Sequence, residues 1–212
     1  MFERIQELDE IILHYINIEW ANPVFDFLLV FMADFGLLMW PLIIAAVIVM
    51  IWGGFRSRLF LILMGLCLLI GDVGINQSIK QTVNRPRPHE TVDGTRRVDW
   101  EGLDKKVAFS KAHTPRKGNS FTSGHICNNV AIAMILTLLF RRKAWPIWIW
   151  AVFMAYSRIY TGDHYFSDAV ASFIVAGLYA SGIYCFIAWL WQLLGPKHFP
   201  KLYERHPKLH SP

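Results

Sequence analysis

Long runs of apolar residues, separated by short charged links, dominate the chain from residue 37 onward. Strand-like alternation is absent from these runs, and most can supply the roughly 20 residues that a membrane-spanning helix needs. Backbone inside lipid must satisfy its own hydrogen bonds, which favours a helical bundle. The pattern predicts an all-α, polytopic transmembrane bundle with five spans: residues 37–52, 59–79, 126–140, 144–156 and 169–194. The fourth is short unless it continues through Arg158 to Gly162.

The N-terminal part follows a different pattern. Residues 3–20 mix acidic side chains with Ile and Leu, which predicts an amphipathic helix lying on a surface, and they lack the features of a cleavable signal. Residues 22–33 are apolar but short, and Asp26 interrupts them. We favour five spans with the N-terminus outside. A sixth span from about Tyr15 to Ala33 is the alternative, and it would put both termini in the cytoplasm.

Composition supports a membrane protein with one domain, residues 1–212. Of the 212 residues, 54% are hydrophobic and 17% charged, which is too apolar for an ordinary soluble protein. The domain divides into N-terminal helices (1–36), a main bundle (37–195) with a long loop (81–121), and a basic tail (196–212). The three cysteines, Cys67, Cys127 and Cys185, fall in apolar helices without paired spacing, so neither disulfides nor a zinc site is expected.

Basic residues predict the orientation of the bundle. Arg56 and Arg58 lie between the first two spans, residues 141–143 follow the third, and the tail is also basic. Short basic links stay in the cytoplasm, so loop 81–121 and the turn at residues 162–164 should lie on the outer face. Nine of the chain's 21 Lys and Arg residues occur between residues 85 and 117. This loop is therefore a charged lid or binding segment.

Three clusters at that outer face combine a cation or an imidazole with backbone-bending residues, as a phosphate site requires. They are Lys80 with Arg87-Pro88; Ser123-Gly124-His125; and Ser157-Arg158 with His164 and Asp168. The set resembles the type 2 phosphatidic acid phosphatase superfamily, whose signatures read K-x6-RP, PSGH and SR-x5-H-x3-D. One position departs from it, because Thr122 stands where the family has Pro. Since Thr can also cap a helix, we expect a change in loop stiffness more than in chemistry.

The third cluster has the most demanding geometry. His164 and Asp168 are four apart at a helix start, so the carboxylate can accept a hydrogen bond from one ring nitrogen and leave the other to attack phosphorus. Arg158 ends the preceding helix at the same face, where phosphate is a bidentate partner for its guanidinium. The resemblance implies that His164 forms a phosphohistidine. It also implies that His125 protonates the leaving group and then serves as base.

The second cluster predicts a phosphate cradle at the start of the third span. Unpaired backbone amides point outward there, and Gly124 lets a ligand approach them beside Ser123. An S-G-H tripeptide alone would indicate only a helix cap. Together with the other two clusters it indicates a phosphate-binding turn.

The first cluster ends a helix with a polar stripe, since Asp72, Asn76 and Lys80 repeat every four positions. The stripe should face the bundle interior and lead to the site. Prolines on both sides of Arg87 should turn the chain so that Arg87 folds back over the same phosphate. Arg85 remains open between a site residue and a side chain that snorkels to the interface. Asp72 could instead accept a hydrogen bond from a neighbouring helix.

Three cations, Lys80, Arg87 and Arg158, can stabilise one phosphate without a metal ion. The sequence also has no carboxylate cluster of the kind that magnesium-dependent phosphatases use. The resemblance likewise implies metal-independent hydrolysis without a cofactor. The residues of the outer loop that we suspect of contacting the head group are His89, Glu90, His113, Arg116 and Lys117, although a solvated polar loop explains each of them equally well.

A charged site above apolar helices suits a phosphorylated membrane lipid. The resemblance favours undecaprenyl diphosphate as substrate, with lipid A 1-phosphate, phosphatidylglycerol phosphate and phosphatidic acid as alternatives, and implies a bacterial inner-membrane protein whose site faces the periplasm. Two other classes stay open: a phosphotransferase to a lipid or sugar acceptor, and a non-catalytic lipid-binding protein, which would not need both histidines. Vanadium haloperoxidases share the signatures but are soluble. The net charge of +5 sits in the cytoplasmic loops and the site, so no nucleic acid partner is expected.

Overall fold

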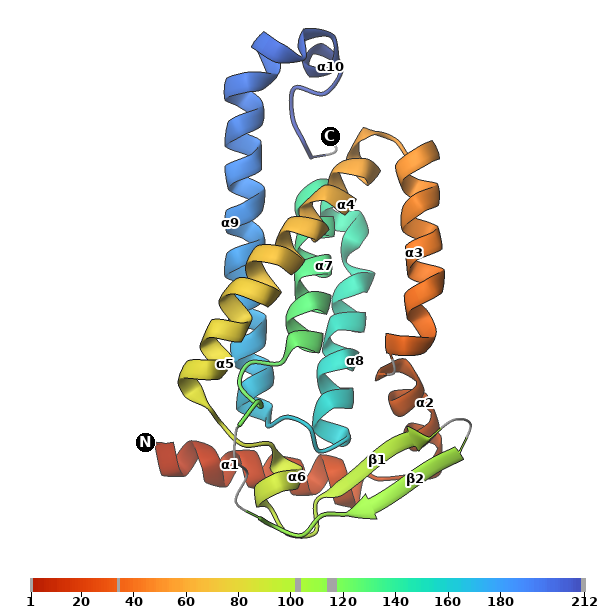
Figure 1. The fold of residues 1–212 in the computed structure, drawn as a ribbon, viewed down its shortest axis with the longest axis vertical. Helices are drawn as coiled ribbons and strands as arrows, with labels where there is room; N and C mark the ends of the chain where they lie inside the picture. Colours follow the sequence, from red (N-terminus) through yellow and green to blue (C-terminus); the bar gives the residue numbers. More distant parts are fainter. Residues whose placement is uncertain (1, 34, 102–103, 114–117, 211–212) are drawn as a thin grey trace.

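The computed structural model describes residues 2–33, 35–101, 104–113 and 118–210. Its main body is a bundle of long helices that run alongside one another (Figure 1). The bundle consists of α3 (Phe35–Trp52), α4 (Phe55–Leu66) continued by the π-helical η2 (Cys67–Asn76) and by α5 (Gln77–Val83), α7 (Gly124–Phe140), α8 (Pro146–Tyr160) and α9 (Phe166–His198). A short 3-10 turn, η3 (Arg141–Ala144), joins α7 to α8.

Three helical stretches among the described residues are long and apolar enough to cross a membrane: Phe55–Thr91, Gly124–Ala144 and Phe166–His198. They coincide with the second, third and fifth predicted spans. The apolar part of α3, Met39–Trp52, is shorter. Helix α8 extends past residue 156 to Tyr160, so the fourth run does continue through Arg158.

The prediction of an all-α protein is wrong in one segment. Within loop 81–121, the chain forms a short helix, α6 (Pro88–Thr91), and two antiparallel strands, β1 (Arg96–Glu101) and β2 (Asp104–Phe109). The register places Arg96 opposite Phe109 and Glu101 opposite Asp104. Residues 97–101 do alternate between polar and apolar types, a signal that the dominant apolar runs obscured, whereas residues 105–109 do not alternate. Strand pairing satisfies the backbone of this segment.

The N-terminal segment does not form one continuous span. Helix α1 (Phe2–His14) and the π-helical turn η1 (Tyr15–Glu19) end before residues 20–22, which are not helical, and α2 (Pro23–Ala33) then begins in a new direction. The side chain of Asn22 accepts hydrogen bonds from the amides of Val24 and Phe25, at 3.1 and 3.0 Å, which starts α2. The segment from about Tyr15 to Ala33 is therefore not one continuous helix, and the choice between five and six spans stays a prediction.

Helix α1 is amphipathic, as predicted, and it lies across one end of the bundle (Figure 1). Its apolar residues Ile5, Leu8 and Ile11 are exposed, whereas Asp9 and Leu13 on the adjoining face are buried against the protein. This orientation suits a helix at a lipid surface, with its apolar stripe turned away from the protein.

Helix α7 forms the centre of the bundle and packs against α9, α8 and α4. Its buried side chains include Ile126, Val130 and Ile135, and they meet Leu63 of α4. Cys67 and Cys127 belong to this core, as expected of packing residues, whereas Cys185 is exposed.

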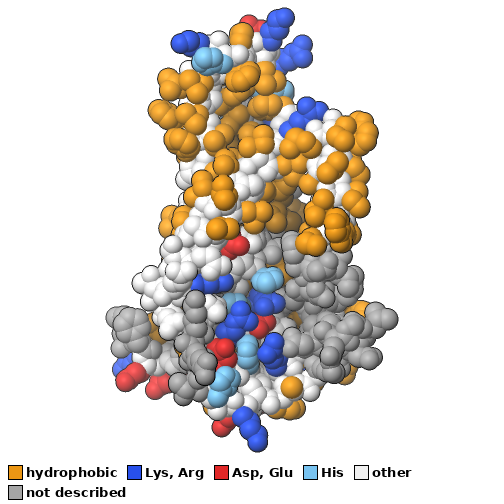
Figure 2. Space-filling model, viewed as in Figure 1, with side chains coloured by type: hydrophobic (Ala, Val, Ile, Leu, Met, Phe, Trp, Pro, Cys, Tyr) orange, Lys and Arg blue, Asp and Glu red, His pale blue; other side chains and the backbone are white. Residues whose placement is uncertain are grey.

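The predicted basic links and the tail lie together at one end. The Arg56 guanidinium donates to the carbonyl oxygens of Leu209 and His210, at 3.1 and 3.0 Å, and Arg141 contacts the His210 ring. The tail itself is partly helical, with α10 (Pro200–Arg205). Figure 2 shows the apolar surface between the two ends, and a cluster of charged and His side chains low on the face in view.

Candidate active site

His164 occupies the turn between α8 and α9 and is 2% exposed. Its Nδ1 lies 2.7 Å from the carbonyl oxygen of Ser120. A carbonyl oxygen can only accept, so Nδ1 carries the proton and Nε2 keeps its lone pair. Burial lowers the pKa of His164, and Arg158 lowers it further, against the opposing effect of Asp168. The imidazole is therefore neutral near pH 7, in the tautomer that a nucleophile requires.

The predicted hydrogen bond between His164 and Asp168 is not formed. Nδ1 of His164 and Oδ2 of Asp168 are 3.9 Å apart. Asp168 instead turns toward the start of α9, where Oδ2 accepts from the amide of Tyr165 at 3.0 Å and from the hydroxyl of Ser120. The carboxylate thus holds Ser120, and the carbonyl of Ser120 holds the imidazole. Sequence reasoning missed Ser120, because only the fold brings residue 120 beside residue 164.

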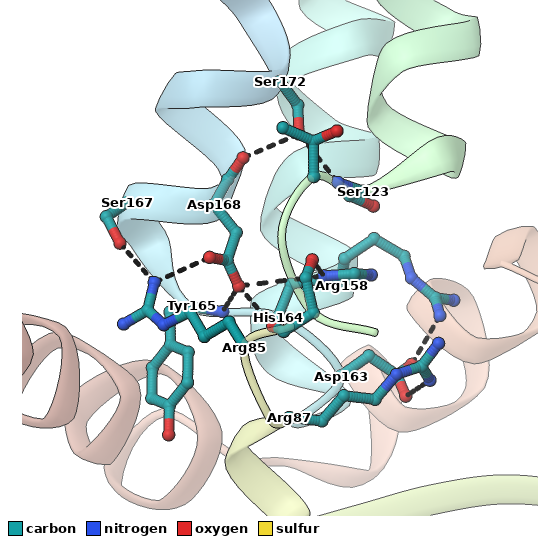
Figure 3. A network of polar contacts seen from close by, with 12 residues as sticks. Arg85, Arg87, Ser123, Arg158, Asp163, His164, Tyr165, Ser167, Asp168 and Ser172 are labelled. Atoms are coloured by element: carbon teal, nitrogen blue, oxygen red, sulfur yellow. Dashed lines mark hydrogen bonds and ion pairs between the residues drawn. The ribbon is translucent and has the colours of Figure 1, made fainter. Parts of the chain in front are cut away.

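Arg85 is a structural part of the site and does not snorkel to the interface. Its guanidinium donates to Oδ1 of Asp168 at 2.6 Å and to Oδ2 of Asp9 at 2.7 Å (Figure 3 shows the contact with Asp168). The plane also lies over the ring of Tyr165, with Cζ 4.1 Å from the ring centroid. These contacts settle the alternative that the sequence left open for Arg85.

Arg87 and Arg158 converge on Asp163, a residue that sequence reasoning did not select (Figure 3). Nη1 of Arg87 lies 3.1 Å from Oδ1, and Nη2 of Arg158 lies 2.6 Å from Oδ2. Burial favours the protonated form of Asp163, but Arg158, His164 and Arg87 together hold its pKa below the usual range. A carboxylate thus already binds the two guanidiniums that were predicted to bind phosphate. The preceding Gly162 has a φ of +74°, which lets the tight turn form.

The start of α7 is built as a helix cap with an open rim. The hydroxyl of Ser123 accepts from the amide of Ile126 at 3.5 Å, and Ser123 is fully buried, so its side chain caps the helix. The amides of Gly124 and His125 donate to no described residue. A Cβ on Gly124 would lie 3.8 Å from Nζ of Lys80, which shows how closely the ammonium approaches this rim. The rim therefore offers two amides and one ammonium to a ligand.

Lys80 ends the predicted polar stripe, and the stripe does face the bundle interior. Asn76 donates to Oδ1 of Asp72 at 2.7 Å, and Asn128 of α7 donates to Oδ2 at 3.4 Å. Asp72 is therefore a helix-to-helix acceptor, as the second interpretation had it. The ammonium of Lys80 makes no hydrogen bond to any residue that the structure describes, and the side chain is half-buried beside the site.

Thr122 does not cap α7, contrary to expectation. Ser123 takes that role, and the buried hydroxyl of Thr122 donates to Oδ1 of Asn76. The residue that replaces the family's Pro therefore anchors the phosphate turn to η2.

His125 is the second residue of α7 and is exposed at the rim. It lies within electrostatic reach of Lys80, Arg158, Asp163 and His164. The predicted acid, on α7, and the predicted nucleophile, in the turn between α8 and α9, thus lie close enough to interact electrostatically.

The suspected head-group residues fall into four groups. His89 is held to the Gly162 carbonyl through both its amide and Nδ1, at 3.2 and 3.0 Å, so it flanks the site. Glu90 accepts from the Arg87 amide at 2.7 Å and is therefore a helix cap, not a head-group contact. His113 is exposed. Arg116 and Lys117 lie outside the described residues. In the described ranges, no group of three or more His, Cys, Asp or Glu side chains could hold a metal ion.

Comparison with known proteins supports a phosphatase relationship. The family model of the PAP2 superfamily matches residues 59–192. Undecaprenyl-diphosphatase BcrC of Bacillus subtilis is 28% identical over 158 residues, which cover 73% of this chain and 71% of that protein. Lipid A 4'-phosphatase of Bacteroides thetaiotaomicron is 26% identical over 194 residues, which cover 89% and 80% of the two chains.

Solved structures share the fold. The crystal structure of LpxE from Aquifex aeolicus superposes with a TM-score of 0.61 at 18% identity, covering 83% of this chain and 94% of that one. A PAP2-type phosphatidylglycerolphosphate phosphatase from Bacillus subtilis gives a TM-score of 0.52 at 21% identity, covering 84% and 85%. At these identities the likeness concerns the fold alone.

Proposed function

This chain belongs to the PAP2 superfamily and is a phosphoric ester hydrolase acting on lipid phosphates; we propose that His164 is its nucleophile and undecaprenyl diphosphate its substrate. The observation that carries the proposal is the contact between Nδ1 of His164 and the carbonyl oxygen of Ser120, from which the tautomer follows. Nδ1 is committed to the Ser120 carbonyl at 2.7 Å, so the lone pair of Nε2 is available to a phosphorus atom.

In the first step, Nε2 of His164 attacks phosphorus, the P–N bond forms and the P–O bond to the leaving group breaks. His125, exposed at the opposite rim, donates a proton to the departing oxygen. The ring keeps its proton on Nδ1, so the phosphohistidine is cationic. In the second step, His125 takes a proton from water, which attacks phosphorus and releases inorganic phosphate and neutral His164.

Cations around the site stabilise the equatorial oxygens in both steps. Arg87 and Arg158 each use part of a guanidinium for Asp163, which leaves further N–H groups for phosphate. Lys80 and the amides of Gly124 and His125 complete the cradle from the other side. No metal enters this cycle.

The proposed location is a bacterial inner membrane, with five spans, the basic links in the cytoplasm and the site at the outer, periplasmic end. Two facts support it: the basic links meet the tail at one end of the bundle, and the phosphate clusters lie at the other end. The apolar part of α3, Met39–Trp52, and the 15-residue α8 are the two shorter spans of this proposal.

A lipid A phosphate is the second candidate substrate. It is favoured by the match to lipid A 4'-phosphatase, which extends over 89% of this chain, against 73% for the undecaprenyl-diphosphatase. Both substrates place a phosphate at the membrane surface and apolar chains in the bilayer, which suits a site at the end of apolar helices.

Phosphate release by the detergent-purified protein tests the proposal, with EDTA present and with His164→Ala as the inactive control. The substrates are undecaprenyl diphosphate, lipid A, phosphatidylglycerol phosphate and phosphatidic acid. We expect the highest kcat/KM with undecaprenyl diphosphate, and an acid-labile phosphoenzyme trapped after rapid mixing. Full activity in the His164→Ala variant would overturn the assignment of the nucleophile. Product analysis with glycerol or a sugar present separates hydrolysis from phosphotransfer.

A further inference from the structure

The N-terminal helix α1 reaches the interior of the site through one side chain, Asp9. This carboxylate is 2% exposed, although it belongs to a helix whose other acidic residues are exposed. Oδ1 of Asp9 accepts from the amide of Ser167 at 2.8 Å, and Oδ2 accepts from Nη2 of Arg85 at 2.7 Å and from the hydroxyl of Ser167. Asp9 is thus bonded to the first turn of α9 and to the arginine that holds Asp168.

Two buried carboxylates share one guanidinium in this arrangement. Arg85 donates 2.6 Å to Asp168 and 2.7 Å to Asp9, and the side chains of both acids are at most 2% exposed. The cluster of Asp9, Arg85 and Asp168 therefore carries a net charge of −1. Burial of an excess charge is costly unless a compensating charge lies close by.

The compensating charge arises during the proposed reaction. His164 is neutral before the attack and becomes a cationic phosphohistidine after it, because Nδ1 keeps its proton. Oδ2 of Asp168 lies 3.9 Å from Nδ1 and bonds the residue whose carbonyl orients the ring. A net negative cluster behind the ring stabilises the cationic ring more than the neutral one.

We propose that Asp9 is a positioning residue of the active site, which keeps the cluster behind His164 negatively charged and thereby favours the phosphohistidine. The proposal rests on the role assigned to His164 above. Without Asp9, Arg85 would neutralise Asp168 alone, and the ring would lose its electrostatic support. Helix α1, which the sequence indicated only as a surface helix, then contributes to catalysis.

Other charged groups also affect His164, so the effect of an Asp9 variant has to be separated from theirs. Asp163 in the same turn, Asp168 of α9 and Arg158 of α8 act on it directly, and His125 of α7 interacts with it. Lys80 of α5 acts on His125, and Arg85 before α6 is paired with Asp168. All of them remain in place in an Asp9 variant that folds. A change in the pKa of His164 in that variant therefore reports the charge of Asp9.

A purely structural role is the competing explanation, since Asp9 also caps the first turn of α9 through Ser167. Asn17 provides the matched comparison. It is fully buried and ties the same N-terminal segment to the carbonyls of Arg96 and Tyr160, at 2.6 and 2.7 Å, without contacting Arg85. Loss of Asn17 should loosen the segment without changing the charge behind His164.

The experiment titrates the His164 ring by NMR in the full detergent-solubilised chain with ¹⁵N-labelled histidine, the signal being assigned by its loss in His164→Ala. We expect Asp9→Asn to lower the pKa of His164 by about 0.5 to 1 unit, as removal of a nearby negative charge does. It should also lower kcat about tenfold while KM stays within about twofold, because the charge acts on the cationic state. Glu7→Gln, an exposed acid on the same helix, should change neither quantity.

Asp9→Asn with an unchanged pKa of His164, and with a kcat no lower than that of an equally destabilised Asn17→Ala, would overturn the proposal. If Asp9→Asn does not fold, Asp9→Ser removes the charge while keeping a polar partner for Ser167, and the same criteria apply. The titration needs no substrate. Failure of the wild-type chain to hydrolyse any lipid would therefore refute the proposed function, while the titration would still decide the role of Asp9.

Discussion

Two aspartates flank His164, and they belong to different regions of the site. Asp163 faces the front, where its partners Arg87 and Arg158 have side chains that are 31% and 11% exposed. Asp168 faces the rear, where it is buried with Asp9, and the Arg85 side chain between them is 18% exposed. The front carboxylate binds the two cations that were predicted to bind phosphate, whereas the rear carboxylate binds a cation that a second carboxylate, Asp9, already holds.

The difference separates recognition from positioning. In the proposed mechanism, phosphate has to compete at the front with an internal anion, so we expect this region to control the affinity and release of phosphate. At the rear, the ion pairs hold Ser120 and the imidazole in place, so we expect this region to control the geometry and charge of the proposed nucleophile. The predictions below test this division.

His164→Ala removes the group that both regions serve, and it should have the largest effect. We expect kcat to fall by roughly 10³-fold or more, as for removal of other enzymatic nucleophiles. Phosphate release under saturating substrate measures it. An unchanged melting temperature would show that the fold survives, and activity within about tenfold of wild type would contradict the assignment.

Arg85→Ala should damage the rear region most. Removing the guanidinium leaves Asp9 and Asp168 buried without their common partner, at a cost of about 3 to 5 kcal/mol. Ser120 then loses its fixed position, and kcat should fall roughly 100-fold. Thermal unfolding and turnover are measured together, with the exposed Arg142→Ala as control. Wild-type stability in Arg85→Ala would show that the rear cluster does not stabilise the fold.

Asp163→Asn should change binding at the front without a comparable loss of stability. The amide no longer competes for Arg87 and Arg158, so inorganic phosphate should inhibit with a Ki roughly tenfold lower, equivalent to ~1.4 kcal/mol. Competitive inhibition against the lipid substrate measures the effect. Weaker phosphate inhibition in the variant would mean that Asp163 organises the two arginines and does not compete with phosphate.

The pH dependence of kcat/KM tests the effect of the front carboxylate, Asp163, on the pKa of His164. Because burial lowers the pKa of His164, the neutral nucleophile persists on acidification, and the acid limb of kcat/KM should lie below the usual histidine value of about 6.5. Asp163 opposes this shift, so Asp163→Asn should move the limb about half a unit further toward acid. Profiles are recorded with the same substrate, so its own ionisation is common to both enzymes. An acid limb that moves toward alkaline pH in the variant would contradict this assignment.

His113→Ala should have the smallest effect. The ring is exposed, and its only side-chain hydrogen bond among the described residues goes to the Lys111 carbonyl at 3.4 Å. We expect kcat/KM to stay within about twofold, and His89→Ala, whose ring flanks Asp163 at 3.8 Å, to have the greater effect. The opposite order would place head-group recognition in the outer segment.

The sequence was sufficient for what depends on local pattern. The apolar runs predicted the long helices, and the motifs identified residues that lie around His164. The spacing of the motifs did not show which of these residues bond to one another. Asp168 is four positions from His164, yet it bonds Ser120, Tyr165 and Arg85, because the start of α9 turns the carboxylate toward the helix.

The sequence did not reveal the contacts that Asp9 and Asp163 make with distant segments. Asp9 and Asp163 look like surface acids in a polar context, and only packing shows that each meets an arginine inside the site. The β-hairpin was missed for a different reason. Only its first strand alternates, over a short and highly charged stretch, and the surrounding apolar runs dominate any window that contains it.

The rear cluster joins residues that are far apart in the sequence, so it can form only late in synthesis. The contact between Asp9 and Ser167 joins positions 158 apart, and that between Arg85 and Asp168 joins positions 83 apart. During synthesis, Asp9 and Arg85 leave the ribosome long before the residues at the start of α9 that both of them contact. A nascent chain can therefore insert its first helices while still lacking both the nucleophile and the charge behind it. Hydrolytic activity should appear only when the start of α9 docks, which protects membrane lipids from an incompletely assembled enzyme.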